Sequence, residues 1–122
     1  MRIIERQMVA AILENKDWRS SNTRVAVTYF AHAAHPIERI NVYLHDNHIA
    51  TVERDQITIN NCGWASPTTK SRLNAILHEF THAGIYQQNH KWYLTSMTDG
   101  TIQMENHKDY IIKTKSVPVT CW

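Results

Sequence analysis

Residues that usually mark a specialised class of protein are scarce in this chain. Only two cysteines, Cys62 and Cys121, occur in 122 residues, and they form no CxxC pair. This excludes a disulfide framework and a zinc site built from paired thiolates. Glycine and proline number three each, too few for a disordered or collagen-like chain. No apolar run approaches the roughly 18 residues of a membrane-spanning helix, so we expect a folded protein without contact to a membrane.

An excess of charge of one sign is also missing. The formal net charge is +2, from 13 Lys and Arg against 11 Asp and Glu, which supports at most a mild attraction to nucleic acid. The first residues are polar and lack the apolar stretch of a secretory signal, which predicts a cytoplasmic protein. A length of 122 residues with 43% hydrophobic residues predicts one domain over residues 1–122.

The spacing of apolar residues predicts two helices. The first runs from Ile4 to about Asn15. The second runs from Thr69 to Ala83, where Thr68 or Thr69 caps the first turn and Gly84 ends the helix in a left-handed conformation. The apolar stripe of this second helix consists of Leu73, Ile76, Leu77 and Phe80.

Alternating apolar and polar residues predict strands before and after the second helix. The strands follow one another through short turns, so they are expected to pair antiparallel, with both helices on one face of the sheet. The fold class is therefore α+β, in the order α-β-β-β-β-α-β-β-β. The tail from about Tyr110 is either an edge strand or a loose arm. The predicted strands cover residues 25–29, 40–44, 49–53, 56–60, 85–88, 91–97 and 101–105.

The one motif with a catalytic mechanism behind it is the HExxH at His78-Glu79-Phe80-Thr81-His82. Positions four apart share a face of a helix, so His78 and His82 could bind one Zn²⁺ while Glu79 acts as general base on a bound water. The chemistry predicted by this motif is zinc-dependent hydrolysis.

Such a site needs a third ligand, and Glu105 is the preferred candidate because it would complete a two-histidine, one-carboxylate set. The longer HExxHxxGxxH motif is absent, since Ile85 and Gln88 occupy its glycine and third histidine positions. The other downstream candidates are His90, His107 and Asp109.

The alternative is that His78, Glu79 and His82 form the solvent-facing side of an amphipathic helix. A chain with 8 histidines contains an HExxH by chance often enough for this explanation to compete with the metal site. On that alternative the protein needs no cofactor.

Two further histidine pairs, His32 with His35 and His45 with His48, could also contribute to a metal site. Histidines in turns and loops are more often solvated than metal-bound, so neither pair is adopted as a ligand set.

Lys70 and Arg72 lie near the start of the second helix, where free backbone N–H groups can hold a phosphate. These two residues are therefore candidates for binding nucleic acid or phosphate. The alternative is a helix start with two solvated cations, because no glycine-rich loop precedes it.

Several segments of the chain resemble a family of small proteins from tailed bacteriophages. The resemblance implies a phage protein made in the cytoplasm of the infected bacterial host, and it carries over no activity and no functional residue. Members of that family share Leu77, Phe80 and Gly84 but do not typically have histidine or glutamate at positions 78, 79 and 82. The segments that carry the resemblance are Gly63-Trp64, Thr68 to Leu77, Gly84 to Gln87 and Lys91 to Tyr93.

The resemblance favours a non-catalytic role. We expect a small phage accessory protein that binds a host protein or a nucleic acid during infection, in host take-over or counter-defence. The alternative is a minimal zinc-dependent hydrolase with His78, His82 and Glu105 as ligands and Glu79 as base.

Overall fold

A computed structural model describes residues 2–30, 37–97 and 100–115. Within these ranges there are two helices and nine strands. Their bounds are α1 (Ile3–Leu13), β1 (Trp18–Ser20), β2 (Thr23–Phe30), β3 (Ile37–Leu44), β4 (Asn47–Val52), β5 (Gln56–Ile59), α2 (Pro67–Phe80), β6 (Ala83–Gln88), β7 (Lys91–Ser96), β8 (Gly100–Gln103) and β9 (Tyr110–Lys113).

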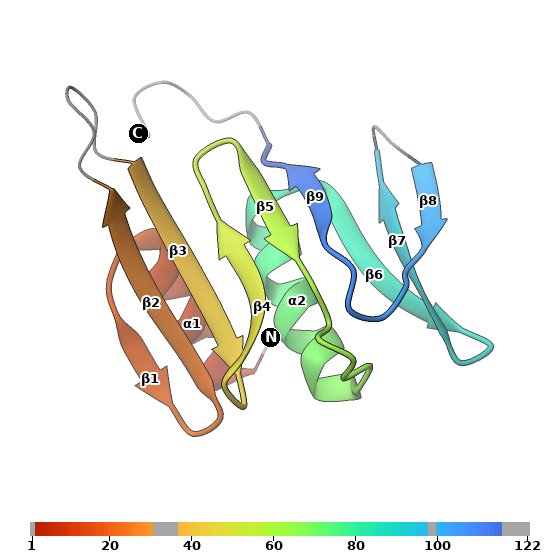
Figure 1. Cartoon of the computed structure of the whole chain (residues 1–122), viewed down its shortest axis with the longest axis horizontal. Coiled ribbons are helices and arrows are strands. Elements are labelled where there is room, and N and C mark those ends of the chain that lie inside the picture. The colour runs from red at the N-terminus through yellow and green to blue at the C-terminus, as the bar shows by residue number, and fades with distance from the viewer. Residues whose placement is uncertain (1, 31–36, 98–99, 116–122) are drawn as a thin grey trace.

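Six strands form the larger of two sheets, in the order β1-β2-β3-β4-β5-β9, with every neighbouring pair antiparallel. Both helices lie on one face of this sheet, and the other face is open (Figure 1). The predicted α+β class and the order of helices and strands are confirmed. The structure adds a short strand, β1, and it shows that Tyr110–Lys113 is an edge strand, paired with Gln56–Ile59.

The three strands after α2 form a separate antiparallel sheet in the order β6-β7-β8 instead of extending the first. The free edge of β5 is taken by β9. The smaller sheet therefore stands beside α2 at one end of the molecule (Figure 1).

Helix α2 begins and ends earlier than its apolar stripe predicted. Ser66 is the N-cap and accepts a hydrogen bond from the Thr69 backbone N–H, at 3.2 Å, while Pro67 occupies the first helical position. At the other end Thr81 is extended, and its hydroxyl donates to the Leu77 carbonyl, at 2.6 Å. The predicted left-handed cap at Gly84 is wrong, because Gly84 lies within strand β6.

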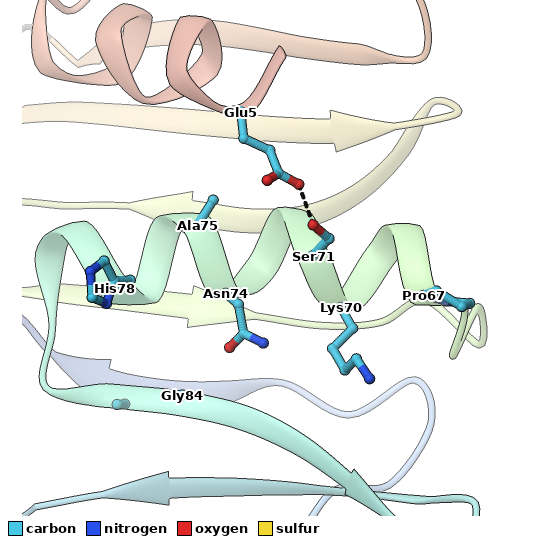
Figure 2. A pocket seen from close by; sticks show the side chains of 9 residues that line it. Glu5, Pro67, Lys70, Ser71, Asn74, Ala75, His78 and Gly84 are labelled. Atoms are coloured by element: carbon cyan, nitrogen blue, oxygen red, sulfur yellow. Dashed lines mark hydrogen bonds between the residues drawn. The ribbon is translucent and has the colours of Figure 1, made fainter. Parts of the chain in front are cut away.

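A buried ion pair joins the two helices. The Arg72 Nη1 atom donates to Glu5 Oε2 at 2.8 Å, and both side chains are 4% exposed. Ser71 also donates to this carboxylate, at 2.5 Å (Figure 2). Burial opposes the charged form of Glu5, but the hydrogen bonds from Ser71, Arg72 and the Arg2 backbone, with the Arg72 charge, outweigh it and lower its pKa.

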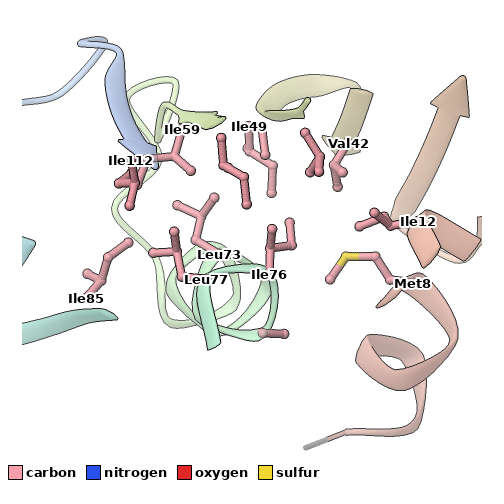
Figure 3. Packing of buried hydrophobic residues seen from close by; sticks show 14 of the residues in the cluster. Met8, Ile12, Val42, Ile49, Ile59, Leu73, Ile76, Leu77, Ile85 and Ile112 are labelled. Carbon is pink, nitrogen blue, oxygen red and sulfur yellow. The ribbon is translucent and has the colours of Figure 1, made fainter. Parts of the chain in front are cut away.

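The hydrophobic core fills the space between the helices and the larger sheet. Met8 and Ile12 of α1 face the sheet, as do Leu73, Ile76 and Leu77 of α2 (Figure 3). These five side chains are at most 2% exposed. The sheet contributes the alternate, inward-facing residues of its strands; those labelled in Figure 3 are Val42, Ile49, Ile59 and Ile112.

The side chain of Asn74 attaches the smaller sheet to α2. Asn74 donates from Nδ2 to the Ile85 carbonyl at 2.8 Å and accepts the Ile85 backbone N–H at 2.7 Å. The Asn74 amide thus forms hydrogen bonds with the backbone N–H and C=O groups at the outer edge of β6, as a neighbouring strand would.

Candidate functional site

The HExxH residues do not share one helical face. His78 and Glu79 lie in the last turn of α2, whereas His82 follows the helix, beyond the extended residue Thr81. All three of His78, Glu79 and His82 are exposed. The i, i+4 geometry that would bring the two imidazoles together on a helix is therefore lost between Phe80 and His82.

Glu105 lies after β8, in the segment that leads to β9, and its carboxylate pairs with Lys108 at 3.1 Å. Within residues 2–30, 37–97 and 100–115, no three His, Cys, Asp or Glu side chains are grouped so that they could hold a metal ion. His32 and His35 lie outside these ranges. The set of His78, His82 and Glu105 stays a prediction that this geometry does not support.

Lys70 and Arg72 have different surroundings, although both were predicted to be surface cations. Arg72 is buried, and its guanidinium donates to Glu5 and, from Nε, to the Thr23 hydroxyl at 3.1 Å. The prediction that Arg72 is a solvated cation is wrong, because its guanidinium is buried and pairs with the Glu5 carboxylate. Lys70 is half-buried and donates to the Gln87 side chain at 3.3 Å.

An open groove of about 560 Å³ runs along the outer side of α2, between α1 and β6. Lys70 and His78 line it (Figure 2). The remaining polar groups of the groove are occupied: Ser71 binds Glu5, and Asn74 binds the backbone of Ile85. The groove is therefore mainly the seam along which α2 contacts its neighbours.

The open face of the six-stranded sheet, on the side away from the helices, carries a different set of side chains. Residues alternate between the two faces of a strand, so the register that turns Val25 and Val42 inward turns Arg24 and Tyr43 outward. We call the side chains that lie side by side across four strands of this face the basic–aromatic row. The row consists of Arg19, Arg24, Tyr43 and His48.

The basic–aromatic row is internally ordered. The Arg24 guanidinium lies 4.0 Å from the centroid of the Tyr43 ring. The Tyr43 ring stacks in turn with His48, with centroids 5.0 Å apart and planes at 27°. His48 also shares a hydrogen bond of 2.8 Å with the Thr51 hydroxyl. Each contact reduces the conformational freedom of a side chain on this face, so the row presents a fixed surface.

Positive charge dominates the strands of the open face. Arg39 and Lys113 join Arg19 and Arg24 as cations. Carboxylates lie beside them at Glu53, directly after β4, and at Asp46, in the β3–β4 turn. Glu53 pairs with Arg39 at 3.4 Å. The remaining cations of this face form no ion pair with the part of the chain that the structure describes.

The sequence contained a partial signal for this face. The alternation of Ile40, Val42 and Leu44 with Asn41 and Tyr43 predicted the strand that carries Tyr43. It could not show that Arg24 and His48 lie on either side of Tyr43, because that depends on the register of β2 and β4. The cations of the face come from strands far apart in the chain.

Residues 1–115 match the family model described as Kyanoviridae Gp96 protein. No curated protein and no solved structure matches the chain. Neither helix in the described residues is long and apolar enough to cross a membrane.

Proposed function

Because this chain belongs to the Kyanoviridae Gp96 family, a family of phage proteins, we propose that it is a small accessory protein that acts without catalysis, by binding nucleic acid in the cytoplasm of the infected host. Its role in infection would be host take-over or counter-defence. A host protein is the alternative partner.

The observation that carries this proposal is the charge of the open sheet face. Arg19, Arg24 and Lys113 point outward without an ion pair in the described part of the chain. Nucleic acid presents one negative phosphate per nucleotide, so unpaired cations on one face are complementary to it. A protein partner of ordinary composition would instead favour an apolar centre with a polar rim.

The shape of the face supports the same partner. An antiparallel sheet with helices on one side and an open face on the other can bind unpaired nucleic acid, because aromatic and planar side chains on the sheet contact bases. Here the exposed His48 supplies such a group, stacked on Tyr43 beside Arg24. Lys70, which the sequence suggested for this role together with Arg72, lies on α2 in the helix layer and binds Gln87.

The test is binding of labelled oligonucleotides, measured by fluorescence anisotropy over a range of salt concentrations. Wild-type protein should bind single-stranded DNA or RNA with an affinity that falls steeply with salt. The double variant Arg24→Glu/Lys113→Glu should reduce the affinity and lower the salt slope by about one for each phosphate that the variant no longer neutralises.

The matched control is Arg6→Glu/Lys70→Glu, which changes the same number of charges in the helix layer. It should leave the affinity nearly unchanged. Equal losses of affinity in both double variants would mean that net charge alone drives binding. If no oligonucleotide binds, and a host protein is bound by wild type but not by Arg24→Glu/Lys113→Glu, the partner is that protein.

A further inference from the structure

A small pocket lies at one end of the open sheet face, between two hairpin turns. The β1–β2 turn and the β3–β4 turn lie next to each other at the same end of the larger sheet (Figure 1). The pocket between them has a volume of about 150 Å³. The residues that matter to its chemistry are Arg19, Arg24, His45, Asn22 and Asp46.

The pocket is lined by two arginines that come from neighbouring strands. Arg19 and Arg24 are directly opposite each other in the β1–β2 register. Like charges in this arrangement repel and destabilise a sheet. Neither arginine forms an ion pair with the described residues, and Asp46 in the same pocket pairs with neither. An anion bound between the two would relieve this repulsion.

Arg24 is held in place for such a role. Its guanidinium lies over the Tyr43 ring, with Cζ 4.0 Å from the ring centroid. The N–H groups lie in the plane of the guanidinium and remain available to an anion, and two of them can bind two oxygens of one phosphate. The Tyr43 ring is itself stacked with His48, with centroids 5.0 Å apart.

The backbone around the pocket is also fixed. The His45 N–H donates to the Asn22 carbonyl at 2.8 Å, which ties the two turns together. Next to Asn22, Thr23 is 1% exposed, and its hydroxyl accepts from the buried Arg72. Arg72 is thus a positioning residue beneath the pocket, although it cannot reach a ligand at the surface.

The size and charge of the pocket define the ligand. A volume of about 150 Å³ is below the roughly 300–1,000 Å³ of sites that enclose a drug-sized molecule, but it accommodates a single phosphate group. The carboxylate of Asp46 in the lining disfavours a second negative charge. A phosphodiester, which carries one negative charge, therefore fits better than a free phosphate dianion.

We propose that this pocket is a phosphate subsite, in which Arg19 and Arg24 bind one phosphodiester group of a single-stranded nucleic acid. The strand then continues along the open sheet face past His48. This inference rests on the proposed function and adds to it the position at which the strand is held.

The experiment compares single alanine substitutions by anisotropy with a labelled single-stranded oligonucleotide. Arg19→Ala and Arg24→Ala should each weaken binding roughly tenfold and lower the salt slope by about one. Lys113→Ala, on the same face but outside the pocket, should weaken binding less than threefold. Arg6→Ala on α1 is the control without effect.

Arg24→Lys separates geometry from charge. It keeps the positive charge and the fold but lacks the planar fork, so it should lose most of the affinity that Arg24→Ala loses. NMR spectra of each variant establish that the fold is intact. A second titration with dimethyl phosphate should move the backbone amide signals of Asn22 and His45 in wild type, and not in Arg24→Ala.

The outcomes are distinguishable. If the oligonucleotide binds but Arg19→Ala and Arg24→Ala lose no more affinity than Lys113→Ala, the subsite is refuted while the proposed function stands. If no oligonucleotide binds but dimethyl phosphate does, the pocket is an anion site and the proposed function fails. If inorganic phosphate shifts the amide signals more strongly than dimethyl phosphate at equal concentration, the preference for a diester is wrong.

Discussion

The two sheets of this protein are stabilised in different ways. The six-stranded sheet is covered by both helices and shares a core in which Met8, Val42 and Ile76 are inaccessible to solvent. The three-stranded sheet buries a few residues of one face, chiefly Ile85 and Trp92, and every residue of β8 is exposed. The larger sheet thus depends on packing and on one buried ion pair, whereas the smaller depends on its attachment to α2. This difference can be tested by disturbing one region at a time.

The largest effect is expected from Glu5→Ala in the larger region. It leaves the buried Arg72 guanidinium without its carboxylate, which costs about 3–5 kcal/mol of unfolding free energy. Chemical denaturation measures this change. The control is Glu14→Ala, which removes an exposed carboxylate of a surface ion pair with Lys16 and should cost less than about 1 kcal/mol. Similar costs for the two variants would contradict a structural role for the buried pair.

A smaller and local effect is expected from Asn74→Ala. It removes both hydrogen bonds to the Ile85 backbone and should cost about 1–3 kcal/mol. Hydrogen exchange should accelerate in β6, β7 and β8 while α1 and the larger sheet stay protected. The control, Gln87→Ala, removes the exposed hydrogen bond to Lys70 and should leave exchange unchanged. Acceleration in both sheets alike would show that they open as one unit.

The smallest effect on stability is expected from a decrease in pH. The pKa of Glu5 is lowered in the folded state, so its contribution to stability is complete above the unfolded value, about 4.3, and is lost as the pH falls through the folded pKa. Chemical denaturation at a series of decreasing pH values should therefore show a larger loss of unfolding free energy for wild type than for Glu5→Gln, in which this group cannot titrate. Parallel curves for the two proteins would rule out Glu5 as a source of acid sensitivity.

Local patterns were enough to predict most elements. The hairpin β3–β4 follows from alternation on both sides of a turn, and α1 follows from its apolar spacing. The start of α2 was mistaken because Thr68 and Thr69 looked like caps, although Pro67 is suited to the first helical position and Ser66 precedes it. The end was mistaken because the apolar stripe gives no sign that the Thr81 hydroxyl binds the backbone.

Partners distant in the chain could not be predicted. Arg72 looked like a surface cation because its carboxylate, Glu5, lies 67 residues away. The same holds for the open sheet face. Arg24 contacts Tyr43, which stacks with His48, and these three residues lie on three different strands. The structure does not support the metal hypothesis for the opposite reason. That hypothesis relied on the local spacing of His78 and His82, and α2 ends before His82.

The pairing of β9 with β5 has a consequence for biosynthesis. The outer edge of β5, Gln56–Ile59, receives its partner only when Tyr110–Lys113 has left the ribosome. By then the hairpins of β6, β7 and β8, whose contacts are local, can already have formed, because short-range pairs close quickly. A nascent chain that stalls before Tyr110 leaves the β5 edge uncovered, and an uncovered edge is a template for aggregation. In the finished sheet the edge is β9, a strand of four residues that ends at Lys113, and short edge strands with lysine disfavour pairing with another chain.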